Sequence, residues 1–125
     1  MSTEILILTK RPKFWETLEP TFHRHNASVL SRPCLEEGLS VLKNGKIPLV
    51  LLDLSRDAGE IRSTVFQILS VNALIHTSVT TDMNAEEFHE AMEGLGMLPP
   101  LPADPKESDI SSLIDALERL NGALN

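Results

Sequence analysis

Residues 49–53 of the chain read LVLLD, four apolar residues in a row that end in a carboxylate. A short apolar run of this kind is typical of a strand that is buried on both faces of a parallel sheet. In open α/β sheets, the carboxyl ends of the strands line the crevice in which ligands bind. We therefore expect Asp53 to emerge at the functional edge of such a sheet.

A second apolar run, Ile5–Leu8, is followed directly by Thr9 and Lys10. If the two runs form neighbouring parallel strands, these two polar residues reach the same sheet edge as Asp53. The Lys10 ammonium is a compact charge that can pair with a carboxylate. The sequence therefore predicts an ion pair between Lys10 and Asp53.

Segments with helical spacing alternate with the apolar runs along the rest of the chain. The segment 12–22 carries a helical stripe, and Pro20 inside it predicts a kinked or broken helix. Asn84 and Glu87 have the spacing of a capping box at the start of a later helix. The expected strands are 5–8, 27–31, 49–53, 73–79 and, within the proline-rich 97–102, a short edge strand; the remaining expected helices are 35–44, 61–69, 85–92 and 105–120.

This alternation predicts an α/β fold. Five strand–helix units with buried strands give a parallel sheet with right-handed crossovers and helices on both faces. The flavodoxin-like strand order 2-1-3-4-5 suits this count and places its switch point between strands one and three. Thr9, Lys10 and Asp53 should then lie together at that point.

Composition limits the possible functions. A chain of 125 residues that is 42% hydrophobic is predicted to form a single domain over residues 1–125. No apolar stretch approaches the roughly 18 residues of a membrane span, and the N-terminus lacks a signal-peptide pattern, so we expect a cytoplasmic protein without membrane contact. The net charge of −7 disfavours nucleic acid as a partner.

With these elements in place, the chain resembles the CheY-like receiver domain of bacterial response regulators, over nearly its whole length. The resemblance rests on five strand–helix units and on an Asp that ends the third strand. It implies a role in two-component phosphorelay signalling, with Asp53 at the position that a histidine kinase phosphorylates. It also implies that Ser78, or its neighbour Thr77, is the hydroxyl residue at the end of the fourth strand.

Other positions depart from the receiver pattern. Thr9 and Lys10 stand where receivers carry the acidic pair that holds Mg²⁺, Leu101 and Pro102 stand where they carry a Lys-Pro pair, and the position of the switch aromatic falls near Leu98. Mg²⁺ prefers carboxylate ligands, so we expect its binding to be weak or absent, and we expect no other metal or cofactor. Without these cations, the charge that develops in phosphoryl transfer is not neutralised. We therefore expect a degenerate pseudo-receiver that is not an enzyme.

Three functions remain open at this point. The first is an interaction module that docks a histidine kinase, an output protein or a second copy of itself. Its expected surface lies within residues 85–120 and includes the apolar side chains of Phe88, Met92, Met97 and Leu98. The second is a phosphoacceptor that a partner kinase still phosphorylates on Asp53. The third, which the sequence favours least, is a binder of small anionic ligands through the basic stretch 10–13.

Overall fold

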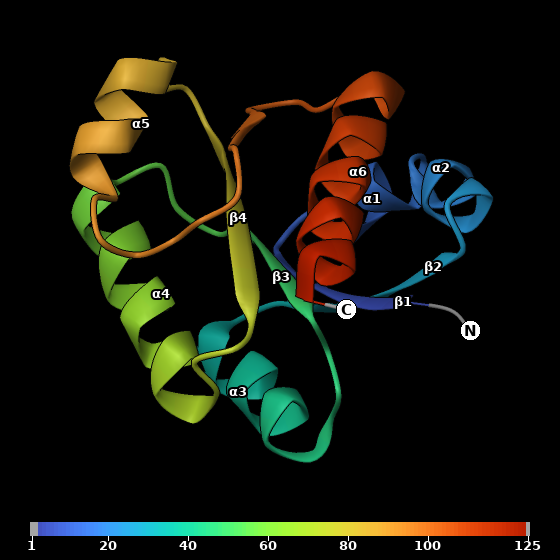
Figure 1. The fold of residues 1–125 in the computed structure, drawn as a ribbon, viewed down its shortest axis with the longest axis horizontal. Coiled ribbons are helices and arrows are strands. Elements are labelled where there is room, and N and C mark those ends of the chain that lie inside the picture. Colours follow the sequence, from blue (N-terminus) through green and yellow to red (C-terminus); the bar gives the residue numbers. More distant parts are fainter. Residues whose placement is uncertain (1–2, 125) are drawn as a thin grey trace.

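The structure, a computed structural model, describes residues 3–124, apart from the side chains of Asn44 and of residues 121–124. Figure 1 shows strands that alternate with helices along the chain. The elements are β1 (Thr3–Thr9), α1 (Pro12–Glu16), α2 (Glu19–Arg24), β2 (Ala27–Arg32), α3 (Leu35–Asn44), β3 (Leu49–Asp53), α4 (Ala58–Val71), β4 (His76–Thr81), α5 (Ala85–Ala91), β5 (Leu101–Pro102) and α6 (Glu107–Leu124).

The five strands form one parallel sheet in the order β2-β1-β3-β4-β5, which confirms the predicted fold class. Thr9 at the end of β1 lies directly beside Asp53 at the end of β3. On the other side of β3, Leu52 is the partner of Val79, so the next residue of β4, Thr80, lies beside Asp53. The carboxyl ends of the three central strands therefore place three polar side chains side by side.

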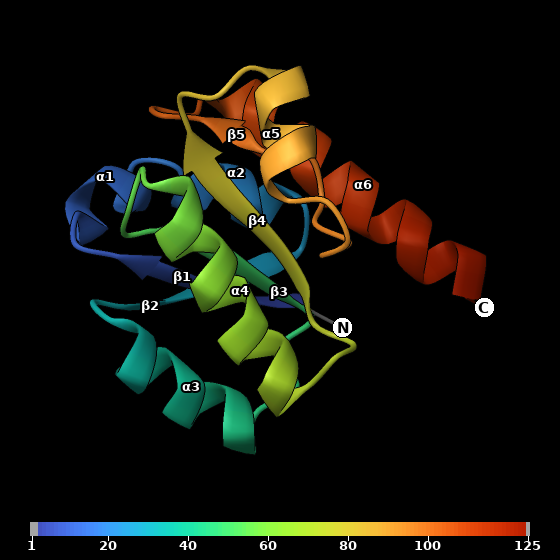
Figure 2. The same ribbon diagram turned by 90° about the vertical axis from the view of Figure 1, so that its left-hand side faces the viewer.

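Helices cover both faces of the sheet (Figures 1 and 2). On one face, Ile5, Ile7, Leu49 and Leu51 pack against α1, α2 and α6 in one buried cluster. On the other face, the alternate residues of β1 and β3 pack against α3, α4 and α5 in a second cluster. All eight core residues of the two central strands, Ile5–Leu8 and Leu49–Leu52, are at most 3% exposed. Burial on both faces explains why their sequences are apolar runs without alternation.

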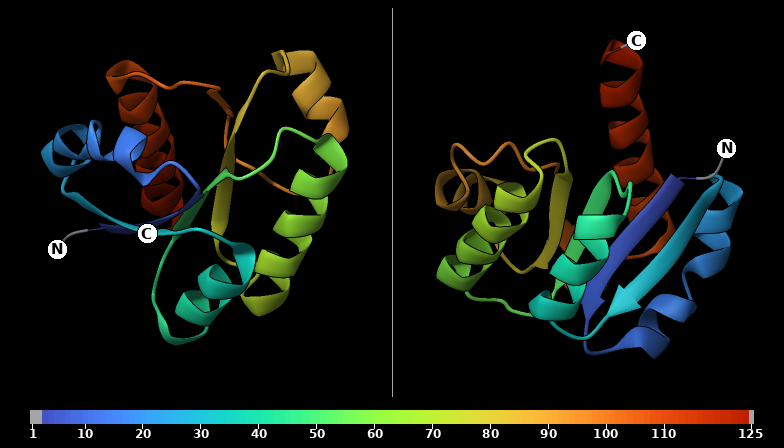
Figure 3. Two further views of the ribbon diagram at one scale, coloured as in Figure 1. Left: turned by 180° about the vertical axis from the view of Figure 1, so that it is seen from behind. Right: turned by 90° about the horizontal axis from the view of Figure 1, so that it is seen from below.

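The last helix, α6, extends beyond the sheet at its C-terminal end, as the right-hand view of Figure 3 shows. Its buried stripe consists of Ile110, Leu113, Ile114 and Leu117. Within residues 3–124, no helix combines the length and the apolar composition that crossing a membrane requires.

Three local predictions are confirmed. The first helical segment is broken into α1 and α2 just before Pro20, which sits in the first turn of α2 where it has no helical hydrogen bond to lose. At the start of α5, the Asn84 side chain accepts the Glu87 N–H and the Glu87 side chain accepts the Asn84 N–H, a complete capping box. The fifth strand is a two-residue edge strand.

The predicted span of the fourth strand, 73–79, is wrong by two to three residues at each end, because β4 runs from His76 to Thr81. The chain makes a tight turn after α4, in which the Asn72 side chain accepts the Leu74 N–H and the Asn72 carbonyl accepts the Ile75 N–H. This turn occupies the first predicted strand residues and leaves Leu74 84% exposed. At its other end, β4 continues two residues beyond the predicted end at residue 79, to Thr81.

The predicted interaction surface is largely buried. Phe88, Met92 and Leu98 are at most 8% exposed, and of the four residues named only Met97 is half-buried. Gly94 and Gly96 adopt positive φ angles and turn the chain back after α5. The Leu98 N–H then bonds to the carbonyl of Thr77 in β4, which places Leu98 in the core. Phe88, Met92 and Leu98 are therefore core residues and do not form the predicted interaction surface.

Candidate functional site

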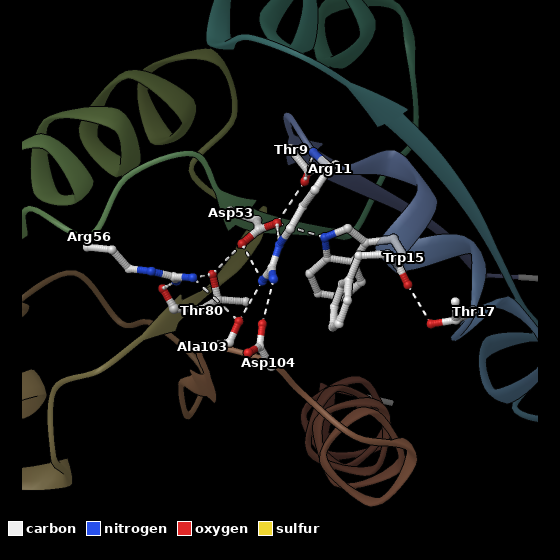
Figure 4. Close-up of polar contacts among 10 residues, drawn as sticks. Thr9, Arg11, Trp15, Thr17, Asp53, Arg56, Thr80, Ala103 and Asp104 are labelled. Atoms are coloured by element: carbon white, nitrogen blue, oxygen red, sulfur yellow. Dashed lines mark hydrogen bonds and ion pairs between the residues drawn. The ribbon is translucent and has the colours of Figure 1, made fainter.

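The candidate site surrounds the side chain of Asp53 at the carboxyl edge of the sheet, and Figure 4 shows its polar contacts. This side chain is only 2% exposed. An isolated carboxylate at this depth is costly to keep ionised unless hydrogen bonds or an opposite charge compensate for the lost water. The surroundings of Asp53 supply both.

Asp53 accepts five hydrogen bonds among the described residues. Oδ2 accepts from Thr9 Oγ1 at 2.7 Å, from Arg11 Nε at 2.8 Å and from Trp15 Nε1 at 2.8 Å. Oδ1 accepts from Arg11 Nη2 at 3.0 Å and from Thr80 Oγ1 at 2.6 Å. A carboxylate offers about four lone-pair sites, so these donors leave little acceptor capacity for another ligand.

Residues close to Arg11 in sequence hold its backbone and side chain in place. Its backbone N–H donates to Thr9 Oγ1 at 3.0 Å, and Pro12 begins helix α1 directly after it. Its guanidinium lies over the ring of Phe14, with Cζ 4.2 Å from the ring centroid. Stacking on an aromatic ring and a fixed backbone keep the planar fork of Arg11 aimed at the carboxylate.

The same guanidinium also connects two loops. Arg11 Nη1 donates to Asp104 Oδ1 at 2.6 Å, and Nη2 donates to the carbonyl of Ala103 at 2.5 Å. Ala103 and Asp104 lie between β5 and α6. Arg11 therefore joins the loop after β1 to the loop after β5, with Asp53 between them.

A second arginine approaches Thr80 from the loop after β3. Arg56 Nη1 donates to the carbonyl of Thr80 at 2.9 Å and to its Oγ1 at 2.7 Å. Because Thr80 Oγ1 accepts from Arg56, its own hydrogen is free to point at Asp53 (Figure 4). Arg56 thus orients the hydroxyl without touching the carboxylate.

The pKa of Asp53 reflects two opposed effects. Burial raises the pKa of this carboxyl, but the hydrogen bonds from Arg11, Thr80, Trp15 and Thr9 together outweigh burial, and the net pKa lies below the usual value. The hydrogen bond to Asp53 in turn raises the pKa of Arg11, and desolvation only partly opposes this. Both shifts favour the charged forms, so Asp53 and Arg11 form an internal ion pair.

Two predicted site contacts are corrected by this geometry. The cation on Asp53 is Arg11, and Lys10 is exposed and forms no ion pair within residues 3–124. Successive residues of an extended chain point in opposite directions, so the residue that follows Lys10 turns back over the sheet edge. The hydroxyl of β4 that bonds to Asp53 is that of Thr80, because β4 extends beyond its predicted end. The Ser78 hydroxyl donates to the carbonyl of Pro99 instead, and Thr77, the residue before Ser78, is buried.

Two other predicted site residues lie elsewhere. Leu101 is 4% exposed and packs in the core beside α6, and Pro102 pairs with Thr81 at the sheet edge. The side chain after β5 that reaches Arg11 is that of Asp104, and it is followed by Pro105. The Asp104 carboxylate therefore binds Arg11 Nη1, while Nε and Nη2 of the same guanidinium bind Asp53.

Sequence reasoning missed Arg11, Trp15, Thr80, Arg56 and Asp104 as site residues. The helical stripe of segment 12–22 indicated packing alone, whereas the Trp15 ring is buried and its N–H also donates to Asp53. A buried tryptophan usually finds a partner for its N–H, which is the signal that could have found it. The remaining four depend on side-chain directions that spacing alone does not determine.

No protein-family model matches the chain, and no curated protein matches its sequence. Its fold does match solved structures. A response regulator receiver domain protein from Clostridium thermocellum is 16% identical, with a TM-score of 0.78 over 98% of this chain and 99% of that one. A CheY-like protein (tadZ) from Pseudomonas aeruginosa is 18% identical, with a TM-score of 0.71 over 94% of both chains.

A third similar structure is a response regulator from Burkholderia pseudomallei with a phosphorylated aspartic acid, a calcium ion and citrate. It is 17% identical, with a TM-score of 0.70 over 98% of this chain and 73% of that one. Identities this low establish the fold and not the chemistry. The chain therefore has the fold of CheY-like response regulator receiver domains.

Proposed function

We propose that this chain is a receiver-type domain of two-component signalling that acts as a protein interaction module, with Asp53 held in an internal ion pair instead of serving as a Mg²⁺-dependent phosphoacceptor. The observation that carries the proposal is the two-point contact of Arg11 with both oxygens of Asp53. A nucleophilic carboxylate needs a free oxygen lone pair, and here every donor around Asp53 competes for it.

The donor set also argues against Mg²⁺ at this site. Mg²⁺ demands near-octahedral oxygen ligands and is usually bound through one or two carboxylates. Around Asp53 the neighbouring groups are two hydroxyls, an indole N–H and a guanidinium, and the second carboxylate, Asp104, contacts the far side of Arg11. A divalent cation would have to displace the positive group that already balances Asp53.

The internal ion pair supports a role that does not depend on phosphate. Arg11 joins the loop after β1 to the loop after β5, so the loop before α6 is held in one arrangement without phosphorylation. A fixed domain can present a docking face to a histidine kinase, an output protein or a second copy. This proposal makes the chain a binding domain and not an enzyme.

Incubation with acetyl phosphate and Mg²⁺, followed by intact-mass analysis, tests the proposal. We expect no phosphoryl adduct on the natural protein, because Arg11 and the other donors occupy both Asp53 oxygens. Arg11→Ala should show partial modification if the ion pair is the obstacle, and Lys10→Ala is the matched control that removes a neighbouring charge without touching Asp53.

A stoichiometric adduct on the natural protein that disappears in Asp53→Ala would overturn the proposal. It would support the second candidate function, a phosphoacceptor modified by a partner kinase. One observation favours that candidate: Asp53 and the Thr80 hydroxyl stand together at the ends of β3 and β4.

A further inference from the structure

A small open cavity of about 290 Å³ lies beside Asp53. Its lining residues are Lys10, Arg11, Asp53, Leu54, Ser55 and Arg56. Three of these six residues are cations and one is an acid. The cavity volume lies just below the range of about 300 to 1,000 Å³ that is typical for drug-sized ligands, which suits a smaller ligand.

The charge of the cavity is only partly balanced. Asp53 is neutralised by Arg11, whose guanidinium also contacts Asp104. Arg56 donates only to neutral oxygens, those of Thr80 and the carbonyl of Ala103, so no carboxylate of the described chain balances it. Lys10 is exposed and pairs with no described carboxylate. Two positive charges therefore face the cavity without a counter-ion.

The nearest acids in sequence are Asp57, in the same loop, and Glu60, in the first turn of α4, and neither lines the cavity. Asp57 accepts the Glu60 N–H as the N-cap of α4, and Glu60 accepts the hydroxyl of Ser55. They leave the Lys10 and Arg56 side of the cavity positive. The chain as a whole has a net charge of −7 and repels anions. A local excess of positive charge attracts an anion by electrostatics, so the cavity is a favourable place for one to bind.

We propose that this cavity binds a phosphate group non-covalently, as inorganic phosphate or as the phosphate of a small phosphomonoester, through Lys10 and Arg56. A phosphate offers several strong acceptor oxygens, and charge-assisted hydrogen bonds from an ammonium and a guanidinium suit it. The Arg56 fork is already oriented by its bonds to Thr80, so little ordering is required when the ligand binds. Metal ions play no part in this binding.

The inference goes beyond the proposed interaction role and does not depend on it. Inorganic phosphate has no activated leaving group and cannot phosphorylate a carboxylate, so its binding here is separate from phosphorylation of Asp53. Whether Asp53 is a phosphoacceptor is decided by intact mass with acetyl phosphate, and the anion site is decided without Mg²⁺ and without a phosphodonor.

The test is a titration of ¹⁵N-labelled protein with sodium phosphate, then with glycerol phosphate, at constant ionic strength maintained with sodium chloride. We expect saturable shifts of the backbone amides of Lys10, Ser55 and Arg56. Lys10→Gln should weaken phosphate affinity about tenfold. Lys13→Gln is the matched control, because Lys13 is an exposed cation of the same stretch that does not line the cavity, and it should change the affinity less than about twofold.

Tighter binding of glycerol phosphate than of inorganic phosphate would identify a phosphomonoester as the ligand class, and equal binding would identify the phosphate ion itself. Shifts that grow linearly with concentration, or an equal loss of affinity in Lys10→Gln and Lys13→Gln, would overturn the proposal. Arg56→Gln provides a second variant, in which the affinity should fall while the amide spectrum of the core remains that of the folded protein.

Discussion

Arg11 and Asp53 form a two-point ion pair, with Nε 2.8 Å from Oδ2 and Nη2 3.0 Å from Oδ1. Only a guanidinium offers two parallel donors in this planar arrangement, and an ammonium such as that of Lys10 cannot. The carboxylate side chain is 2% exposed, whereas 32% of the Arg11 side chain remains exposed. The pair therefore buries its anion more deeply than its cation, so loss of Arg11 leaves the costlier charge behind.

Arg11→Ala should lower the free energy of unfolding at pH 7 by about 3 kcal/mol, because removing one partner leaves a buried and uncompensated charge. Lys10→Ala should change it by no more than about 0.5 kcal/mol, because Lys10 is exposed. Urea denaturation of both variants measures the two values. Equal effects of the two substitutions would contradict the assignment of Arg11 as the cation of Asp53.

The pH dependence of stability should change sign at Asp53 in the Arg11→Ala variant. In the natural protein the pKa of Asp53 is lowered on folding, so its contribution to stability is present above the unfolded pKa of about 3.9 and is lost as pH falls through the folded value. Without Arg11, burial should raise the pKa above the unfolded value. Stability from this group should then be present below about pH 3.9 and be lost as pH rises through the folded pKa.

Carboxyl-carbon NMR titration of Asp53 measures this difference directly. We expect a midpoint below the usual range in the natural protein and in Lys10→Ala, and a midpoint above it in Arg11→Ala. A midpoint that is the same in all three proteins would show that Arg11 does not govern the ionisation of Asp53.

Thr80→Val should raise the pKa of Asp53, because the substitution removes the 2.6 Å hydrogen bond to Oδ1 and keeps the side-chain shape. Ser78→Ala is the control: it removes a buried hydroxyl of the same strand that donates to the Pro99 carbonyl and lies away from the carboxylate. The same NMR titration applies. A rise in Ser78→Ala and none in Thr80→Val would restore Ser78 as the hydroxyl of the site.

Asp104→Ala should lower the free energy of unfolding by less than about 1 kcal/mol, although its contact with Arg11 is only 2.6 Å long. The Asp104 side chain is 76% exposed, and exposed ion pairs contribute little because water and salt screen them. Urea denaturation compares this variant with Arg11→Ala. A loss as large as that of Arg11→Ala would place the main stabilising contact of Arg11 at Asp104 and not at Asp53.

Addition of Mg²⁺ should leave the fluorescence of Trp15 unchanged at low millimolar concentration. Trp15 is the single tryptophan of the chain, and its Nε1 donates to Asp53, so it reports on any ligand that competes for that oxygen. A titration with MgCl₂, against an NaCl titration of equal ionic strength, makes the measurement. A saturable change with Mg²⁺ alone would contradict the exclusion of the ion by the Arg11–Asp53 pair.

The sequence by itself determined the architecture and the place of the site. Apolar runs of four residues have one stable location, between two helical layers, so Ile5–Leu8 and Leu49–Leu52 specified the two central strands. The alternation of strands with helical segments then determined a parallel sheet in the order that the structure has. The sequence also predicted the helix break before Pro20 and the capping box at Asn84, because both features depend only on residues close together in the chain.

Only the tertiary structure decided which side chains meet at Asp53. The turn at Asn72 delays the start of β4, and a shift of a few residues along a strand exchanges Ser78 for Thr80 beside the carboxylate. Likewise, the direction in which the loop leaves β1, and the ring of Phe14 beneath the guanidinium, bring Arg11 and not Lys10 onto Asp53. These contacts join residues 27 and 42 positions apart, and they depend on the packing of whole elements, which no local pattern of the chain encodes.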